Sequence, residues 1–384
     1  MEYIRRFDTA QEKAEATLVY PNVNYVEETD VVSIEASAPT PPGPHDYSLD
    51  YFTLSYTTAG TFKMPSVSVD YSTDGQSWTT LASNTVSPSM SAGTKVRMKR
   101  VHGLVSLGRI VTTGQFTVEG NAMSLVYGDN FTGQTSLSGY NIYDGLLSGS
   151  TGLTSAANLV LPATTLVPHC YDSMFADCTS LTTAPALPAT NLGQAYNCYE
   201  AMFSGCTSLA TAPTLPATAL TVYCYANMFQ GCTSLTGAPD LPAETLVDFC
   251  YQSMFSGCTS LEIPPYMSAT TLATACCEYM FKDCTSLTDS PELMPTAFDG
   301  NTACYSNMFN GCSSLTAITA NFEDWPGTDY TNDWVVGVAA YGTFFRNPNA
   351  QWEAYGEYAV PYDWDVFPPF DHDGPIDEPI PDPD

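Results

Sequence analysis

Positive charge is scarce in this sequence. Lys and Arg together number 11, against 41 Asp and Glu, which leaves a formal net charge of −30 over 384 residues. A surface with this balance repels phosphate backbones, so we expect no nucleic-acid partner. All charged residues together make up only 14% of the chain, while hydrophobic residues make up 44%. This composition predicts a folded protein with a polar but mostly uncharged surface.

Long apolar segments are lacking as well. No stretch approaches the roughly 18 consecutive apolar residues that a membrane-spanning helix needs, so we expect no membrane span. The first residues, from Met1 to Lys13, contain no apolar segment followed by a small-residue cleavage site. We therefore expect a protein that is made and folded in a cytoplasm, where its 13 cysteines are mostly reduced.

Catalytic signatures are equally sparse. The chain has four histidines, and the dinucleotide-binding, Walker and Gly-x-Ser-x-Gly motifs are missing. The carboxylates Asp172, Glu200, Glu244 and Glu278 are interpreted as scattered rather than recurring at one repeat position. A paired-carboxylate glycosidase stays open on spacing alone. The prediction is a protein that is not an enzyme and that binds no cofactor and no metal.

An internal repeat dominates the C-terminal half of the chain. A cysteine recurs at steps of 28, 26, 26, 26 and 28 residues, preceded each time by Met-Phe and followed by Ser-Leu. Upstream, Ser150 takes the place of the cysteine in a degenerate first unit. The repeated cysteines are Cys178, Cys206, Cys232, Cys258, Cys284 and Cys312.

One unit predicts a short helix followed by a short strand. Leu166, Cys170, Met174 and Cys178 are four residues apart, a spacing that puts them on one face of a helix. The run from Ser180 to Ala184, closed by a proline, is typical of a brief strand. Neither element can bury its apolar side alone, so we expect the units to stack at about 4.8 Å per rung.

The cysteines have three interpretations. They can be small buried hydrophobic side chains in two ladders, thiols paired as disulfides between adjacent rungs, or zinc ligands. The spacing is not Cys-x-x-Cys, and Cys276-Cys277 interrupts the Cys-Tyr pattern, which favours packing. A serine in place of one of these cysteines should then cost more stability than an alanine, because a buried hydroxyl needs a partner.

The repeat resembles a known family. Its motif is Cys-Tyr-x-x-Met-Phe-x-x-Cys-Thr-Ser-Leu, with Leu-Pro-Ala-Thr between units, and both flanks from residue 115 to residue 367 match in kind. This combination resembles BspA-type leucine-rich repeats, which occur in surface proteins of gut Bacteroidetes and in phages that infect them. The resemblance implies an α/β solenoid of about seven rungs with a C-terminal cap. It implies function only weakly, because such repeats serve many roles.

A small antiparallel β-sandwich is expected before the repeats. Residues 47–98 alternate apolar and polar side chains, and Asp74-Gly75 marks a tight turn. The basic residues that follow are either charges on the solvent side of a strand or a contact for an acidic partner, such as another copy of the chain. They are Lys95, Arg97, Lys99, Arg100 and Arg109.

The N-terminal residues are expected to dock the protein. Residues 1–36 are too few to fold alone, and a Pro-rich linker separates them from the rest. They resemble the N-termini of virion proteins in crAss-like and related Bacteroides phages, which implies binding to capsid or other virion proteins. The candidate docking residues are Phe7, Leu18, Tyr20, Val23, Tyr25 and Val26.

These observations predict an α+β protein located on a virion surface. We expect a phage head fibre or capsid decoration protein that forms a dimer or trimer. A bacterial BspA-like cell-surface adhesin and an intracellular scaffold are the alternatives. The expected parts are a docking segment (1–36), a linker (37–46), the β-sandwich (47–114), the solenoid entry with its first repeat (115–157), six repeats (158–320), a cap (321–367) and an acidic Pro-rich tail (368–384).

Host attachment through glycans is a further hypothesis. One tyrosine recurs in nearly every repeat and could supply stacking area and a polar edge to sugars. The alternative is that these tyrosines pack inside the ladder with Phe175 and its equivalents. The candidate glycan contacts are Tyr171, Tyr199, Tyr225, Tyr251 and Tyr305.

Overall fold

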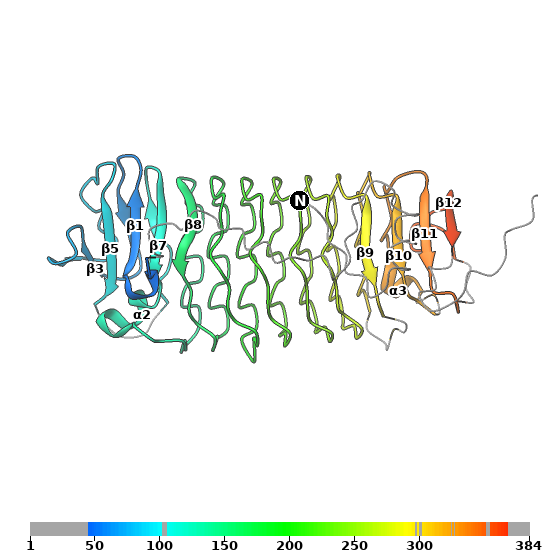
Figure 1. The fold of residues 1–384 in the computed structure, drawn as a ribbon, viewed down its shortest axis with the longest axis horizontal. Coiled ribbons are helices and arrows are strands. Elements are labelled where there is room, and N and C mark those ends of the chain that lie inside the picture. The colour runs from blue at the N-terminus through cyan, green and yellow to red at the C-terminus, as the bar shows by residue number, and fades with distance from the viewer. Residues whose placement is uncertain are drawn as a thin grey trace, which may run out of the picture. The chain divides into compact units, whose positions relative to one another are not determined.

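The computed structural model describes residues 45–101, 106–295, 298, 302–323, 325, 327–350 and 354–367. The docking segment 1–36, most of the linker and the acidic tail 368–384 lie outside the described residues. From Tyr47 onward the chain forms one compact unit. In that unit, loops wind back and forth in parallel between a sheet at each end (Figure 1).

The first part of this unit is a six-stranded sheet with the order β4-β3-β5-β1-β7-β8. All neighbours pair antiparallel except β7 and β8, which pair parallel. A separate antiparallel pair, β2–β6, packs Phe62 against Tyr71 at 5.4 Å between ring centroids. The strands are β1 (Phe52–Tyr56), β2 (Phe62–Lys63), β3 (Val69–Ser72), β4 (Thr79–Leu81), β5 (Lys95–Arg100), β6 (Val111–Thr112), β7 (Phe116–Asn121) and β8 (Leu153–Val160).

Residue 114 is therefore not a boundary between a sandwich and a solenoid. Strand β7 starts just after it and lies inside the sheet, with β1 on one side and β8 on the other. Strand β8 in turn bridges to the next turn of the chain through Ser155 and Thr183. Because β8 belongs to both structures, one continuous core runs from the sheet into the repeats.

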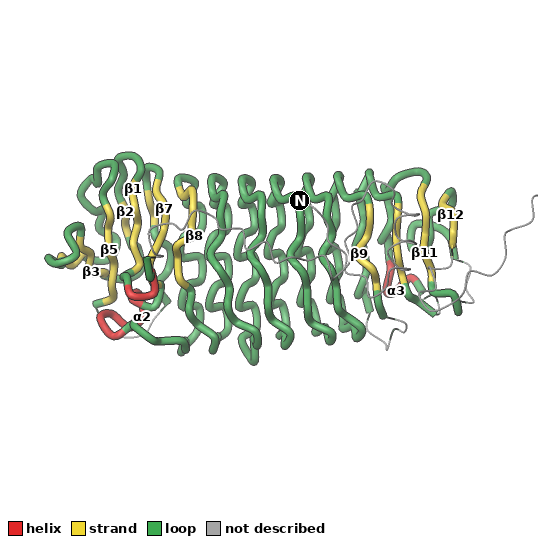
Figure 2. The backbone as a smooth tube through the Cα atoms, viewed as in Figure 1, coloured by secondary structure: helices red, strands yellow, loops and turns green. Residues whose placement is uncertain are grey.

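Each repeat makes one turn of the chain, which we call a coil. Neighbouring coils run parallel and are bonded backbone to backbone, as from Tyr171 N to Cys198 O (2.9 Å) and from Phe175 N to Met202 O (2.9 Å). The amides between them turn inward to their own coil, as from Met174 N to Tyr171 O (3.2 Å). Alternate amides thus build the turn and the stack, and Figure 2 shows these coils almost entirely as loop.

The helix expected in each unit is not formed. Every fourth residue between the two cysteine positions has a positive φ, which a right-handed helix excludes. The four-residue spacing of Cys170, Met174 and Cys178 comes instead from successive turns, each of which returns one side chain to the interior. After the middle units the expected brief strand is reduced to isolated bridges such as Thr211 to Gly237, whereas residues 289–293 and 317–320, which follow Cys284 and Cys312, do form strands.

Regular strands return at the C-terminal end. A four-stranded parallel sheet has the order β12-β11-β10-β9, and the chain leading into it still forms coils, because Phe309 N bonds to Trp334 O at 2.8 Å. The buried indole of Trp334 covers the last phenylalanine ring and donates from Nε1 to Ala359 O at 2.8 Å. These strands are β9 (Asp289–Leu293), β10 (Ala317–Ala320), β11 (Gly342–Arg346) and β12 (Trp364–Phe367).

Helices are short throughout the described residues. They are α2 (Ser124–Tyr127), α3 (Thr328–Thr331) and the 3-10 turns η2 (Tyr47–Leu49) and η3 (Gly128–Asn130). Within the described ranges, no helix has both the length and the apolar character needed to cross a bilayer.

Candidate functional site

The repeated tyrosines lie in the core. Tyr171, Tyr199, Tyr225 and Tyr251 are at most 2% exposed and stack nearly parallel on one another, with ring centroids 5.5 to 6.1 Å apart. Tyr305, also buried, continues the position beyond the coil where Cys277 replaces the ring. The packing alternative therefore holds, and burial excludes a glycan-contact role for all five rings.

The cysteines are also interior. All thirteen are buried free thiols. Each thiol of the second ladder donates to a backbone carbonyl of the preceding coil, as from Cys232 Sγ to Phe203 O (3.1 Å) and from Cys258 Sγ to Phe229 O (3.0 Å). Burial raises the pKa of Cys232 well above its usual value, which leaves almost no thiolate to attack or to bind a metal.

This hydrogen bond reverses the expected ranking of serine and alanine. In Cys232→Ser the hydroxyl can donate to the Phe203 carbonyl oxygen that accepts from the thiol in the wild-type protein. A buried serine, Ser150, already occupies the same position in the first repeat. We expect Cys232→Ala to lower the free energy of unfolding by about 1–2 kcal/mol and Cys232→Ser to cost no more than that. Urea unfolding of both variants measures this. A serine variant much less stable than the alanine variant would contradict it, and a reductant should leave the melting temperature unchanged.

Two of the five basic residues, Lys95 and Lys99, form ion pairs within the chain. Lys95 on β5 forms an ion pair with Glu119 on β7, across the intervening β1, and Lys99 Nζ lies 2.8 Å from Asp129 Oδ1. The Lys99 ammonium also lies over the Trp78 ring, 4.3 Å from a ring centroid. These contacts favour the interpretation of strand surface charges over a contact that waits for an acidic partner.

Three acidic side chains from adjacent coils form a column, so the interpretation of Asp172 and Glu200 as scattered rather than recurring at one repeat position is wrong. Asp144, Asp172 and Glu200 occupy the same place in successive coils, since Gly145 N bonds to Asp172 O and Ser173 N bonds to Glu200 O, each at 2.8 Å. We call these three residues the carboxylate column. The three acids are 28 residues apart in the sequence, so an alignment of the repeats places them at the same position.

Each acid of the carboxylate column has a partner three residues earlier. Asn141 Nδ2 donates to Asp144 Oδ2 (3.1 Å), His169 Nδ1 lies 2.9 Å from Asp172 Oδ2, and Asn197 donates to Glu200. The partners at residues 141, 169 and 197 all have a positive φ, which Asn and His adopt more readily than most residues.

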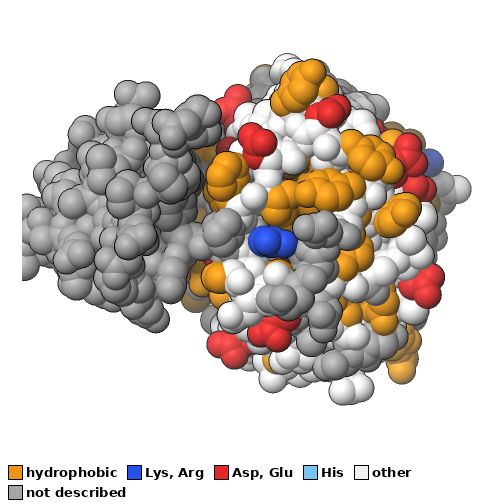
Figure 3. Space-filling model, turned by 90° about the vertical axis from the view of Figure 1, so that its right-hand side faces the viewer, with side chains coloured by type: hydrophobic (Ala, Val, Ile, Leu, Met, Phe, Trp, Pro, Cys, Tyr) orange, Lys and Arg blue, Asp and Glu red, His pale blue; other side chains and the backbone are white. Residues whose placement is uncertain are grey.

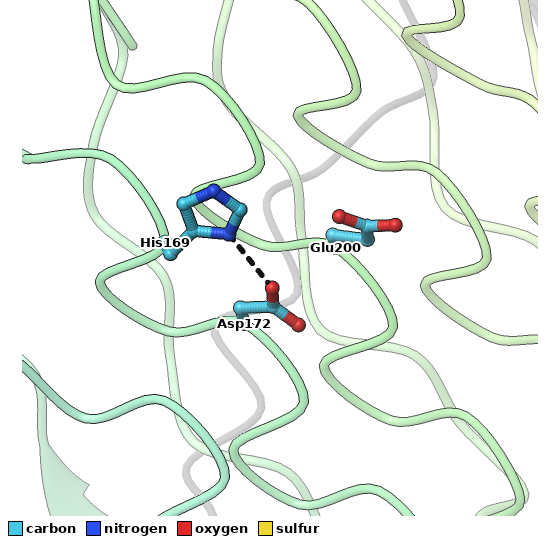
Figure 4. Close-up of side chains that lie close together, drawn as sticks. All are labelled: His169, Asp172 and Glu200. Carbon is cyan, nitrogen blue, oxygen red and sulfur yellow. Dashed lines mark hydrogen bonds and ion pairs between the residues drawn. The ribbon is translucent and has the colours of Figure 1, made fainter. Parts of the chain in front are cut away.

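His169, Asp172 and Glu200 form the tightest group on this column. Their ligand atoms all lie within 4.8 Å of one another, and the three residues are half-buried. Figure 4 shows His169 and Asp172 on one turn and Glu200 on the neighbouring coil. Burial raises the pKa of Asp144 and of Glu200, and the nearby Asp172 carboxylate adds to both increases. The group has the residue types that can hold a cation.

Four exposed tyrosines belong to the C-terminal part of the chain, beyond the six repeats. Tyr341 and Tyr362 are 76% and 79% exposed, and Tyr355 and Tyr358 are also exposed. Two of these rings, Tyr358 and Tyr362, both pack close to Gly356, which has a φ of +126°. A Cβ atom at Gly356 would lie within 4 Å of each ring. Figure 3 looks at this end, where hydrophobic side chains spread over the described face with acidic side chains around it. We call these four residues the terminal tyrosines.

The candidate docking residues Phe7, Leu18, Tyr20, Val23, Tyr25 and Val26 lie outside the described residues. Comparison with known proteins adds no relative: no family model, no curated protein and no solved structure matches the chain.

Proposed function

We propose that this chain is a structural virion protein, a phage head fibre or capsid decoration protein that uses residues 1–36 for docking and presents its stacked coils to the outside. The proposal rests on the resemblance of the repeats to BspA-type units and of the N-terminus to those of virion proteins. A bacterial cell-surface adhesin with the same repeats is the alternative.

The observation that carries this proposal is the continuous aromatic ladder inside the coils. The phenylalanine rings from Phe175 to Phe309 stack at 5.4 to 5.8 Å, coil after coil, and Trp334 ends the series. Close-packed interiors resist deformation, so such a body is suited to hold its two ends apart. The repeated aromatic side chains are used for packing inside a stiff body, and this supports an architectural role rather than catalysis.

Deleting residues 1–36 tests the docking part of this proposal. The truncated protein keeps the whole compact unit from Tyr47 onward, so we expect it to fold but no longer to co-sediment with particles of the phage that encodes it. A matched deletion of the tail 368–384 should leave co-sedimentation intact. Full occupancy of particles by the protein that lacks 1–36 would contradict the proposal, and failure of the intact chain to bind any particle would favour the adhesin.

The terminal tyrosines support an adhesive role at the end that faces outward. Exposed aromatic rings beside acidic groups suit the stacking and hydrogen bonding that glycans require. On an array of host capsular polysaccharides, probed with an oligomeric form to gain avidity, we expect binding that falls at least about tenfold in Tyr358→Ala/Tyr362→Ala. The control is Tyr140→Ala, a ring 65% exposed near the opposite end of the coils. Equal loss in both variants, or no binding by the wild-type protein, would leave an architectural role alone.

A further inference from the structure

The group around His169 differs from every other acidic group in the described coils. His169 is the single histidine between residues 103 and 371, and no Lys or Arg occurs between Arg109 and Lys282. Two half-buried carboxylates, Asp172 and Glu200, nevertheless lie with it. In the described residues the one basic side chain that pairs with them is the His169 ring, at Asp172. The cluster therefore carries negative charge that the chain itself does not balance.

The group offers one nitrogen and two carboxylate ligands, and this combination favours some metal ions over others. An imidazole nitrogen and two carboxylate oxygens are the ligand types of zinc sites, in which three protein ligands leave a fourth position for water. Calcium and magnesium favour oxygen ligands alone, and thiolate sites require cysteines that are deprotonated and within reach. All the thiols of this chain are buried, and burial raises the pKa of Cys198 and Cys170, the two closest to this group in the sequence, so thiolates do not compete.

The coils themselves provide a comparison within one molecule. Glu278 occupies the same repeat position as Glu200, but the residue three before it is Ala275, and its carboxylate accepts a hydrogen bond from Gln252 Nε2 at 2.7 Å. Only the group around His169 combines the imidazole with carboxylates from two coils, among the residues that the structure describes.

We propose that His169, Asp172 and Glu200 form a binding site for a divalent transition cation of the zinc type. The cation would join two adjacent coils through side chains and balance their charge, with neutral imidazole as the nitrogen ligand. Asp144, one coil away, is a further acid of the same carboxylate column. A site of this kind would stabilise the N-terminal end of the coils.

The test is a calorimetric titration of the full-length protein with ZnCl₂, in parallel with CaCl₂. We expect one zinc ion bound per chain with a rise in melting temperature, and no comparable effect of calcium. His169→Asn should weaken zinc binding by at least about tenfold, since loss of even an outer partner of a zinc ligand costs that much. This variant should fold, because asparagine fills the same position at Asn141 and Asn197 and bonds there to the carboxylate.

Glu200→Gln should weaken zinc binding similarly, while the matched control Glu278→Gln should leave it unchanged. Co²⁺ gives a second measurement: its spectrum in the wild-type protein should lack a thiolate charge-transfer band and should change in His169→Asn. Zinc binding that survives both His169→Asn and Glu200→Gln would overturn the proposal. Equal weakening by Glu278→Gln, or equal affinity for calcium, would mean diffuse attraction to an acidic surface instead of a site.

Discussion

Phe229→Ala is expected to lower the free energy of unfolding by about 3–5 kcal/mol, the range for truncating a buried phenylalanine. The ring lies between those of Phe203 and Phe255, at 5.7 and 5.6 Å between centroids, and is fully buried. Its removal leaves a cavity that neither neighbour can fill, because each is held in its own coil by backbone hydrogen bonds on both sides. Urea unfolding followed by far-UV circular dichroism measures the loss.

The control for this ladder is Tyr266→Ala. That ring is 63% exposed, so its removal should change stability by no more than about 0.5 kcal/mol. A loss in Phe229→Ala as small as in the control would mean that the coils do not depend on the aromatic ladder. The architectural role proposed for the protein would then lose its main support.

Gly152→Ala should separate the N-terminal sheet from the coils. A methyl group at this position would lie 2.0 Å from the backbone oxygen of Gly114, just where β7 and β8 begin to pair. The atoms in the way belong to the main chain of Gly114, which cannot rotate aside as a side chain could. We therefore expect the free energy of unfolding to fall by at least about 3 kcal/mol, the upper end of the cost of overpacking. Hydrogen exchange should show the amides of β7 and β8 losing protection first.

Gly237→Ala provides the matched substitution. There the added methyl group meets the Ile263 side chain at 3.7 and 3.8 Å, an ordinary contact, and the backbone has no positive φ. We expect stability to be unchanged or raised by up to about 1 kcal/mol, since alanine restricts the unfolded chain. If both glycine variants behave alike, the β7–β8 junction is not the rigid link described above.

The sequence predicted the spacing of the buried side chains but not the backbone conformation that produces this spacing. A spacing of four residues, as from Cys170 to Met174, suits an α-helix and equally suits a chain that turns every four residues. The distinguishing signal was the residue type between them: Gly205, Gly231 and Gly257 stand just before their cysteines, at positions with a positive φ. Left-handed residues at a regular interval are incompatible with a helix and typical of successive turns.

Some of the candidate sites could be predicted from the sequence, and others depend on the tertiary structure. Tyr225 belongs to the recurring Cys-Tyr pair and is buried, whereas Tyr266 lies outside that pair and is 63% exposed. The carboxylate column joins residues 28 apart, so it exists only once the coils are in register. The terminal tyrosines lie outside the repeat and were found by exposure rather than by motif.

The sequence by itself determined the repeat length, the set of side chains that must be buried and the acidic character of the surface. These are properties of residue type and interval, which hold whatever the path of the backbone between them. Only the tertiary structure decided that the coils are built from turns, that β7 and β8 join the N-terminal sheet to them, and that His169, Asp172 and Glu200 come together. Each of these depends on hydrogen bonds between residues far apart in the chain, and those bonds form only when neighbouring coils stack.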